Sequence, residues 1–138
     1  MSAPRPPRVL ILDDRRDSAS FLCSIFTAHA FESASTSDIH RAMDSVLEED
    51  VDVVVVAYLS DGAATAHAVT RVRSSPEAAV RDVAMVTLVD DPWSAEQAIA
   101  AGADAVLVRP VHASRLVAVV SRSAATKPAS RAARRTAF

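Results

Sequence analysis

Several kinds of residue on which binding and catalytic sites depend are scarce in this sequence. Cys23 is the only cysteine, which excludes an internal disulfide and a cysteine-based zinc site. Because Gly62 and Gly102 are the only glycines, the chain can form neither a GxGxxG dinucleotide-binding fingerprint nor a phosphate-binding P-loop. The four histidines form no HExxH or other clustered ligand motif. We therefore expect no enzyme activity and no cofactor.

Aromatic side chains and long apolar runs are also rare. Hydrophobic residues make up 50% of the 138 positions but aromatic residues only 4%, so we expect an aliphatic core. No apolar run approaches the roughly 20 residues that a helix needs to span a bilayer. The N-terminal segment MSAPRPPR lacks the apolar region of a signal peptide. The length fits one domain, and we expect a cytoplasmic protein.

Short apolar runs, in contrast, recur along the chain. Residues 8–12, 51–56, 82–89 and 105–108 are mostly aliphatic or β-branched without alternation, which is typical of buried strands of a parallel sheet. Residues 32–36 are a weaker strand candidate. Helix-like segments separate these runs, and the connections are short. Five such repeats predict a parallel sheet with helices on both faces and right-handed crossovers.

The segments between the predicted strands have apolar residues at helical spacing. Asp91 and Pro92 are expected to open one helix that Gly102 closes, and Ser37 is the expected N-cap of another. The apolar positions of the five helices are expected to be Phe21, Leu22, Ile25 and Phe26, with His29 in the same series; Ile39, Ala42, Met43, Val46 and Leu47; Ala66, Val69 and Val72; Ala95, Ala98 and Ile99; and Leu116, Val119 and Val120.

The run VDVVVVAYLSDG, residues 51–62, is the expected central strand and the loop after it. Open α/β sheets place their chemistry at the carboxyl edge of such strands. The residue at this edge is Ala57, which has no functional group.

Four segments resemble the receiver domain of bacterial response regulators: VLILDD, DVVVVAYL, MVTLVD and AGADAVLVRP. The resemblance extends over about residues 8–122. It implies a flavodoxin-like fold, a doubly wound five-stranded parallel sheet of order 2-1-3-4-5 between two helix layers. It also implies a role in two-component signal transduction.

The resemblance also assigns roles to individual positions. In the family, an acidic pair after the first strand holds magnesium, and an aspartate after the third strand accepts a phosphoryl group. A hydroxyl after the fourth strand and a lysine after the fifth hold the phosphoryl oxygens. Asp13 and Asp14 match the acidic pair and Thr87 the hydroxyl. Pro110 matches the proline that usually follows the lysine across a cis bond.

At several other positions the chain departs from the family pattern. Ala57 replaces the acceptor aspartate and Arg109 the lysine. Val106 replaces the aromatic switch residue, and Leu88 lies where a small residue normally admits the phosphodonor. Because alanine has no nucleophile, an aspartyl phosphate cannot form at position 57.

Two carboxylates lie near the missing acceptor in the sequence. Asp52 lies five residues before position 57, or about 16 Å along a strand, at the opposite end of the sheet. Asp61, four residues after it, is the alternative acceptor that the sequence leaves open.

Asp13 and Asp14 would repel one another without a cation. We expect Arg109 to reach this pair and act as a permanent counter-ion, because a guanidinium can bind carboxylates bidentately. The alternative is a weak magnesium site at Asp13 and Asp14, with Arg109 facing solvent.

A partner protein is expected on the face made by the fourth helix, the fifth strand and the last helix, through which receivers generally signal. Trp93, the only tryptophan, lies in the first turn of that fourth helix and is the expected interface residue. The partner could also be a second copy of the chain. In the alternative, Trp93 folds back over the sheet edge as a lid.

The expected organisation is an N-terminal extension (1–7), a receiver-like domain (8–122) and a disordered basic tail (123–138). We predict a stand-alone pseudo-receiver that acts in trans, independently of phosphorylation, by binding another protein. Two alternatives stay open: a ligand-binding or enzymatic module that uses the sheet edge, and nucleic-acid association through the tail. The tail could also be a solubilising end without a partner.

Overall fold

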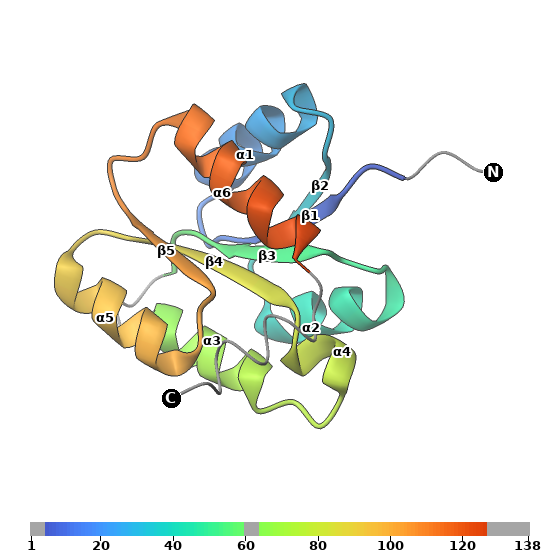
Figure 1. The fold of residues 1–138 in the computed structure, drawn as a ribbon, viewed down its shortest axis with the longest axis vertical. Coiled ribbons are helices and arrows are strands. Elements are labelled where there is room, and N and C mark those ends of the chain that lie inside the picture. Colours follow the sequence, from blue (N-terminus) through green and yellow to red (C-terminus); the bar gives the residue numbers. More distant parts are fainter. Residues whose placement is uncertain (1–4, 60–63, 127–138) are drawn as a thin grey trace.

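The computed structural model describes residues 5–59 and 64–126 and contains a five-stranded parallel sheet (Figure 1). Its strand order is β2-β1-β3-β4-β5, which confirms the predicted flavodoxin-like topology. The strands are β1 (Arg8–Leu12), β2 (Glu32–Thr36), β3 (Val53–Val56), β4 (Ala84–Val89) and β5 (Ala105–Val108).

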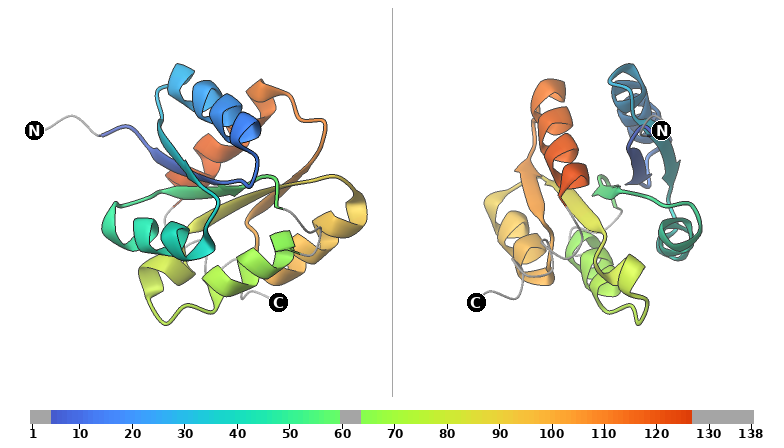
Figure 2. Two further views of the ribbon diagram at one scale, coloured as in Figure 1. Left: turned by 180° about the vertical axis from the view of Figure 1, so that it is seen from behind. Right: turned by 45° about the vertical axis from the view of Figure 1, so that its right-hand side comes forward.

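Helices cover both faces of the sheet, which gives three layers (Figures 1 and 2). One face is covered by α1 (Arg16–Ala28) and α6 (Ala113–Ala125). The other face is covered by α2 (Ile39–Glu48), α3 (Ala64–Arg73), α4 (Ala78–Arg81) and α5 (Pro92–Ala101). The sequence analysis did not predict the four-residue α4. No helix in the described ranges has both the length and the apolarity needed to cross a membrane.

The valine run of β3 lies at the centre of the core. Val53 and Val55 pack on the side of α1 and α6, and Val54 and Val56 on the side of α2 and α3. All four are fully buried, and each contributes about 1.5 kcal/mol by the removal of its side chain from water. A strand covered on both faces explains why the run shows no alternation.

One expected helix cap is confirmed, and another is wrong. The side chain of Asp91 accepts a hydrogen bond from Ser94 N at 2.7 Å, and Gly102 ends α5 with φ 115°. The N-cap of α2, however, is Asp38 and not Ser37: Asp38 Oδ1 accepts from His40 N at 2.8 Å. The carboxylate of Asp38 also interacts favourably with the helix dipole, so it is the better cap of the two.

Four residues expected on inward helical faces are exposed instead: Phe21, His29, Leu47 and Ile99. The inward face of α1 contains Leu22 and Phe26, and one residue of rotation, about 100°, turns Phe21 away from it. In α5, Ala98 faces the core, so its neighbour Ile99 points outward.

The predicted boundary of the C-terminal tail is also corrected. Helix α6 continues to Ala125, because Ala124 still packs against the core cluster and alanine favours helix. Residues 123–125 therefore belong to the folded domain, and residues 127–138 lie outside the described residues.

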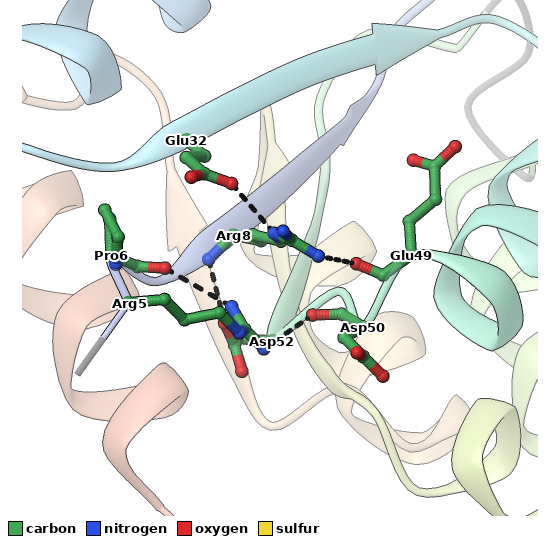
Figure 3. A network of polar contacts seen from close by, with 7 residues as sticks. All are labelled: Arg5, Pro6, Arg8, Glu32, Glu49, Asp50 and Asp52. Atoms are coloured by element: carbon green, nitrogen blue, oxygen red, sulfur yellow. Dashed lines mark hydrogen bonds and ion pairs between the residues drawn. The ribbon is translucent and has the colours of Figure 1, made fainter. Parts of the chain in front are cut away.

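The end of the N-terminal extension is attached to the amino edge of the sheet (Figure 3). Asp52 Oδ2 accepts hydrogen bonds from Arg8 N at 2.8 Å and from Arg5 Nη1 at 3.0 Å. The Glu32 carboxylate accepts from Arg8 Nε at 2.8 Å and raises the pKa of Arg8 above its usual value. Asp52 thus stabilises the start of β1, and it precedes β3 rather than following it, at the opposite edge from position 57.

Candidate functional site

The carboxyl edge of the sheet brings together the positions that the sequence analysis singled out. Leu12, Val56, Thr87 and Val106 lie side by side in register on β1, β3, β4 and β5. Ala57 follows Val56, and its backbone N–H donates to Leu12 O at 2.9 Å.

Position 57 is closed by packing. Ala57 is 2% exposed and Leu88 is 5% exposed, and both belong to the apolar cluster under α1 and α6. A methyl group held in this way offers neither a nucleophile nor space for a phosphodonor.

The two aspartates after β1 have different surroundings. Asp13 is buried; its Oδ1 accepts from Arg15 N at 2.8 Å, whereas its Oδ2 is buried without a hydrogen-bond partner. Asp14 is exposed, and its backbone N–H donates to Tyr58 O at 2.6 Å.

These residues provide fewer carboxylates than the magnesium site of the family. Magnesium needs near-octahedral oxygen ligands, and the position of the third carboxylate is occupied by Ala57. Within residues 5–59 and 64–126, no three Asp, Glu, His or Cys side chains form a group that could hold a metal ion.

Thr87 keeps the position of the family hydroxyl and is completely buried. Its Oγ1 has no hydrogen-bond partner in the described part of the chain. A buried hydroxyl without a hydrogen bond lowers the stability of the fold by about 1–3 kcal/mol. Because Ala57 cannot be phosphorylated, the Thr87 hydroxyl has no phosphoryl oxygen to bind.

The expected ion pair between Arg109 and the two aspartates is wrong. Arg109 Nη1 donates to Asp90 Oδ1 at 3.2 Å. The backbone explains why Arg109 pairs with Asp90. The N–H of Arg109 donates to Val89 O at 2.7 Å, which places Arg109 beside Asp90, the residue after β4. The Arg109–Pro110 peptide bond is cis, as the resemblance implied.

Tyr58 is a site residue that the sequence analysis missed. The guanidinium carbon of Arg109 lies 3.7 Å from the centroid of its ring, and that of Arg15 lies 4.2 Å from it. Planar guanidinium groups stack well on aromatic faces. The available signal was an aromatic residue directly after β3, with arginines in the loops after β1 and β5.

Asp61, the alternative acceptor, lies outside the described residues.

A model of the response regulator receiver domain matches residues 9–121. The chain belongs to this family.

Solved structures of similar proteins agree with the receiver-domain fold. A response regulator from Thermotoga maritima is 18% identical, with 88% of this chain and 99% of that chain covered and a TM-score of 0.73. The chemotaxis response regulator CheY4 of Vibrio cholerae is 19% identical, with 86% and 98% covered and a TM-score of 0.69. The receiver domain of the Francisella response regulator 1452 is 20% identical, with 86% and 96% covered and a TM-score of 0.71. A comparison with curated protein sequences finds no match.

The receiver domain exposes apolar side chains on the face made by α5, β5 and α6. Trp93 is 64% exposed, so it does not fold back over the sheet edge as a lid. Ile99 on α5 and Val108 on β5 are also exposed. A groove of 740 Å³ lies along this face and includes Val106, which is half-buried.

Proposed function

We propose that this receiver domain acts in signal transduction without phosphorylation, as a cytoplasmic protein whose role is to bind another protein. The observation that carries the proposal is Ala57, which is packed to 2% exposure at the position of the phosphoryl acceptor. No chemistry of the side chain at this position can transmit a signal.

The surroundings of Ala57 support the same conclusion. Leu88 packs in the same core cluster as Ala57. The guanidinium of Arg109 contacts Tyr58 and Asp90 rather than residue 57. Val106 cannot act as the aromatic residue that changes rotamer in phosphorylated receivers. The output face therefore has no phosphoryl group to respond to and remains in one state.

The binding face is the α5–β5–α6 face. Trp93, Ile99 and Val108 present large apolar side chains to solvent there. Tryptophan is over-represented among interface hot spots, where truncation often costs about 2 kcal/mol or more. The partner is another protein, or a second copy of the chain. Association with nucleic acid through the tail concerns residues 127–138 and has no support in the described residues.

Partner capture with matched variants tests the proposal. Wild type, Trp93→Ala and Leu47→Ala are each used to capture proteins from a lysate of the native host, and the yields are compared by mass spectrometry. Leu47 is an exposed apolar residue on α2, a helix that is not part of the α5–β5–α6 face, and it does not line the groove. We expect Trp93→Ala to reduce the captured yield of one partner protein at least about tenfold, and Leu47→Ala to leave that yield unchanged. Equal capture by all three folded proteins would show that the interface lies elsewhere.

Self-association is the second arm of the same test. If the partner is a second copy, sedimentation velocity shows a dimer of the wild type that Trp93→Ala weakens and Leu47→Ala preserves.

A further inference from the structure

A hollow of 480 Å³ opens between α1 and α6 at the carboxyl edge of the sheet. Leu88 and Leu116 form its buried floor, and Phe21 and Ile25 form its wall on α1. The volume lies within the range of about 300–1,000 Å³ that is typical of small-molecule sites. Neither phosphorylation nor the α5–β5–α6 face accounts for it.

One side of this hollow is polar and carries a cation. Arg109 and Asp90 line it together with Tyr58 and Ser18. Apolar walls with a few convergent polar groups are the usual composition of a ligand site. The ligand that suits this arrangement has an apolar body and one anionic group.

Arg109 has unused capacity to bind an anion. Its Nη1 is held by a single oxygen of Asp90 at 3.2 Å, and its Nη2 is buried without a hydrogen-bond partner in the described ranges. A guanidinium can bind a carboxylate through two parallel hydrogen bonds, which are stronger than one. The contact seen here therefore falls short of what Arg109 can make.

Asp90 is a weak internal competitor for the same cation. Its side chain is 71% exposed, whereas that of Arg109 is 15% exposed. Because Asp90 makes a single contact and is already mostly in water, it can turn away from Arg109 at a lower cost than a buried carboxylate could. A ligand carboxylate can then take the place of Asp90 on Arg109.

We propose that the hollow between α1 and α6 binds a small carboxylate with an apolar body, whose carboxylate replaces Asp90 on Arg109. The apolar body lies against Leu88, Leu116 and Phe21. This site goes beyond the proposed function and does not depend on it. It would give the receiver domain an input that needs no acceptor at position 57.

The test is an amide NMR titration of the full chain with 2-naphthoate as the probe. We expect saturable shifts confined to α1, the loops after β3, β4 and β5, and the start of α6. The neutral isostere 2-naphthylmethanol should bind at least about tenfold more weakly, because it lacks the charge-assisted hydrogen bonds. Absence of saturation at concentrations on the order of 10 mM, or equal binding of the two compounds, would overturn the proposal.

Variants with opposite expected effects identify the site. Arg109→Gln should weaken 2-naphthoate binding about tenfold or more, whereas Asp90→Asn should tighten it about two- to fivefold by removal of the competitor. Phe21→Ala removes an exposed wall residue and should weaken binding severalfold. Arg41→Gln, an exposed arginine on α2, is the matched control and should leave binding unchanged.

The Asp90 and Phe21 variants decide the outcome even if Arg109→Gln does not fold, since both residues are largely exposed. Weaker binding by Asp90→Asn, or unchanged binding by Phe21→Ala, would contradict the assignment.

Discussion

The guanidinium group of Arg109 lies 3.7 Å from the ring centroid of Tyr58. Arg15 places its own guanidinium 4.2 Å from the same centroid. Tyr58 follows directly after Ala57, so the two arginines bind the residue next to the closed acceptor position and not a phosphoryl group. The carboxyl edge is thus held by a cation–π cluster of the loops after β1, β3 and β5.

Tyr58→Leu should lower the free energy of unfolding by about 1–2 kcal/mol, because two cation–π contacts are lost together. Urea denaturation measures the change. Tyr58→Phe keeps the ring and should stay within about 0.5 kcal/mol of wild type. Equal losses in the two variants would show that the ring faces contribute nothing.

The ion pair between Arg109 and Asp90 should contribute little. Asp90 is largely exposed, so a double-mutant cycle with Arg109→Gln and Asp90→Asn should give a coupling energy below about 1 kcal/mol. The coupling should fall further at high salt. A coupling above about 2 kcal/mol would mean that Asp90 is a structural partner that a ligand cannot displace.

Magnesium should not stabilise this protein. With alanine in place of the third carboxylate, addition of magnesium chloride should leave the melting temperature of the wild type unchanged. Arg109→Ala should behave in the same way, because Arg109 pairs with Asp90 and not with Asp13 or Asp14. Stabilisation of Arg109→Ala by magnesium, but not by an equal ionic strength of sodium chloride, would contradict this.

Arg73 should be a major contributor to stability. Its guanidinium donates to Val83 O at 2.6 Å, Gly102 O at 2.9 Å and Asp104 Oδ2 at 2.8 Å, and so links α3 to the amino ends of β4 and β5. Arg73→Met should cost about 3–5 kcal/mol, since it removes the guanidinium that pairs with the largely buried Asp104 carboxylate.

Arg71→Met is the matched control on the same helix. Arg71 is exposed, so its replacement should change stability by less than about 0.5 kcal/mol in the same urea experiment. Similar losses for both arginines would show that the hydrogen bonds of Arg73 add nothing specific.

The sequence predicted the sheet well because its signals are local. The ranges 8–12, 32–36 and 105–108 match the observed strands, and unbroken valine at 53–56 indicated a strand buried on both faces. The cap at Asp91 was predicted from its position before Pro92. The N-cap of α2 is Asp38 and not the predicted Ser37. The identity of a cap depends on the residue at which the helix begins, and the sequence pattern does not determine that residue to within one position.

The contacts of the site could not be predicted in the same way. Arg109 has several carboxylates within reach of a long side chain, and the choice of Asp90 depends on how the loop after β5 pairs with Val89. The Tyr58 cluster joins three loops that are distant in sequence. The Arg73 network likewise joins α3 to residues 8 to 31 positions away.

Intact mass after incubation with acetyl phosphate and magnesium tests the central claim most directly. The wild-type protein should gain no phosphoryl group, because Ala57 is closed and lacks a nucleophile. The Ala57→Asp variant should gain one slowly or not at all, since Leu88 still crowds the position and Arg109 is not a lysine. A stoichiometric gain of one phosphoryl group by the wild type, mapped by peptide analysis to Asp61 or any other residue, would contradict the account.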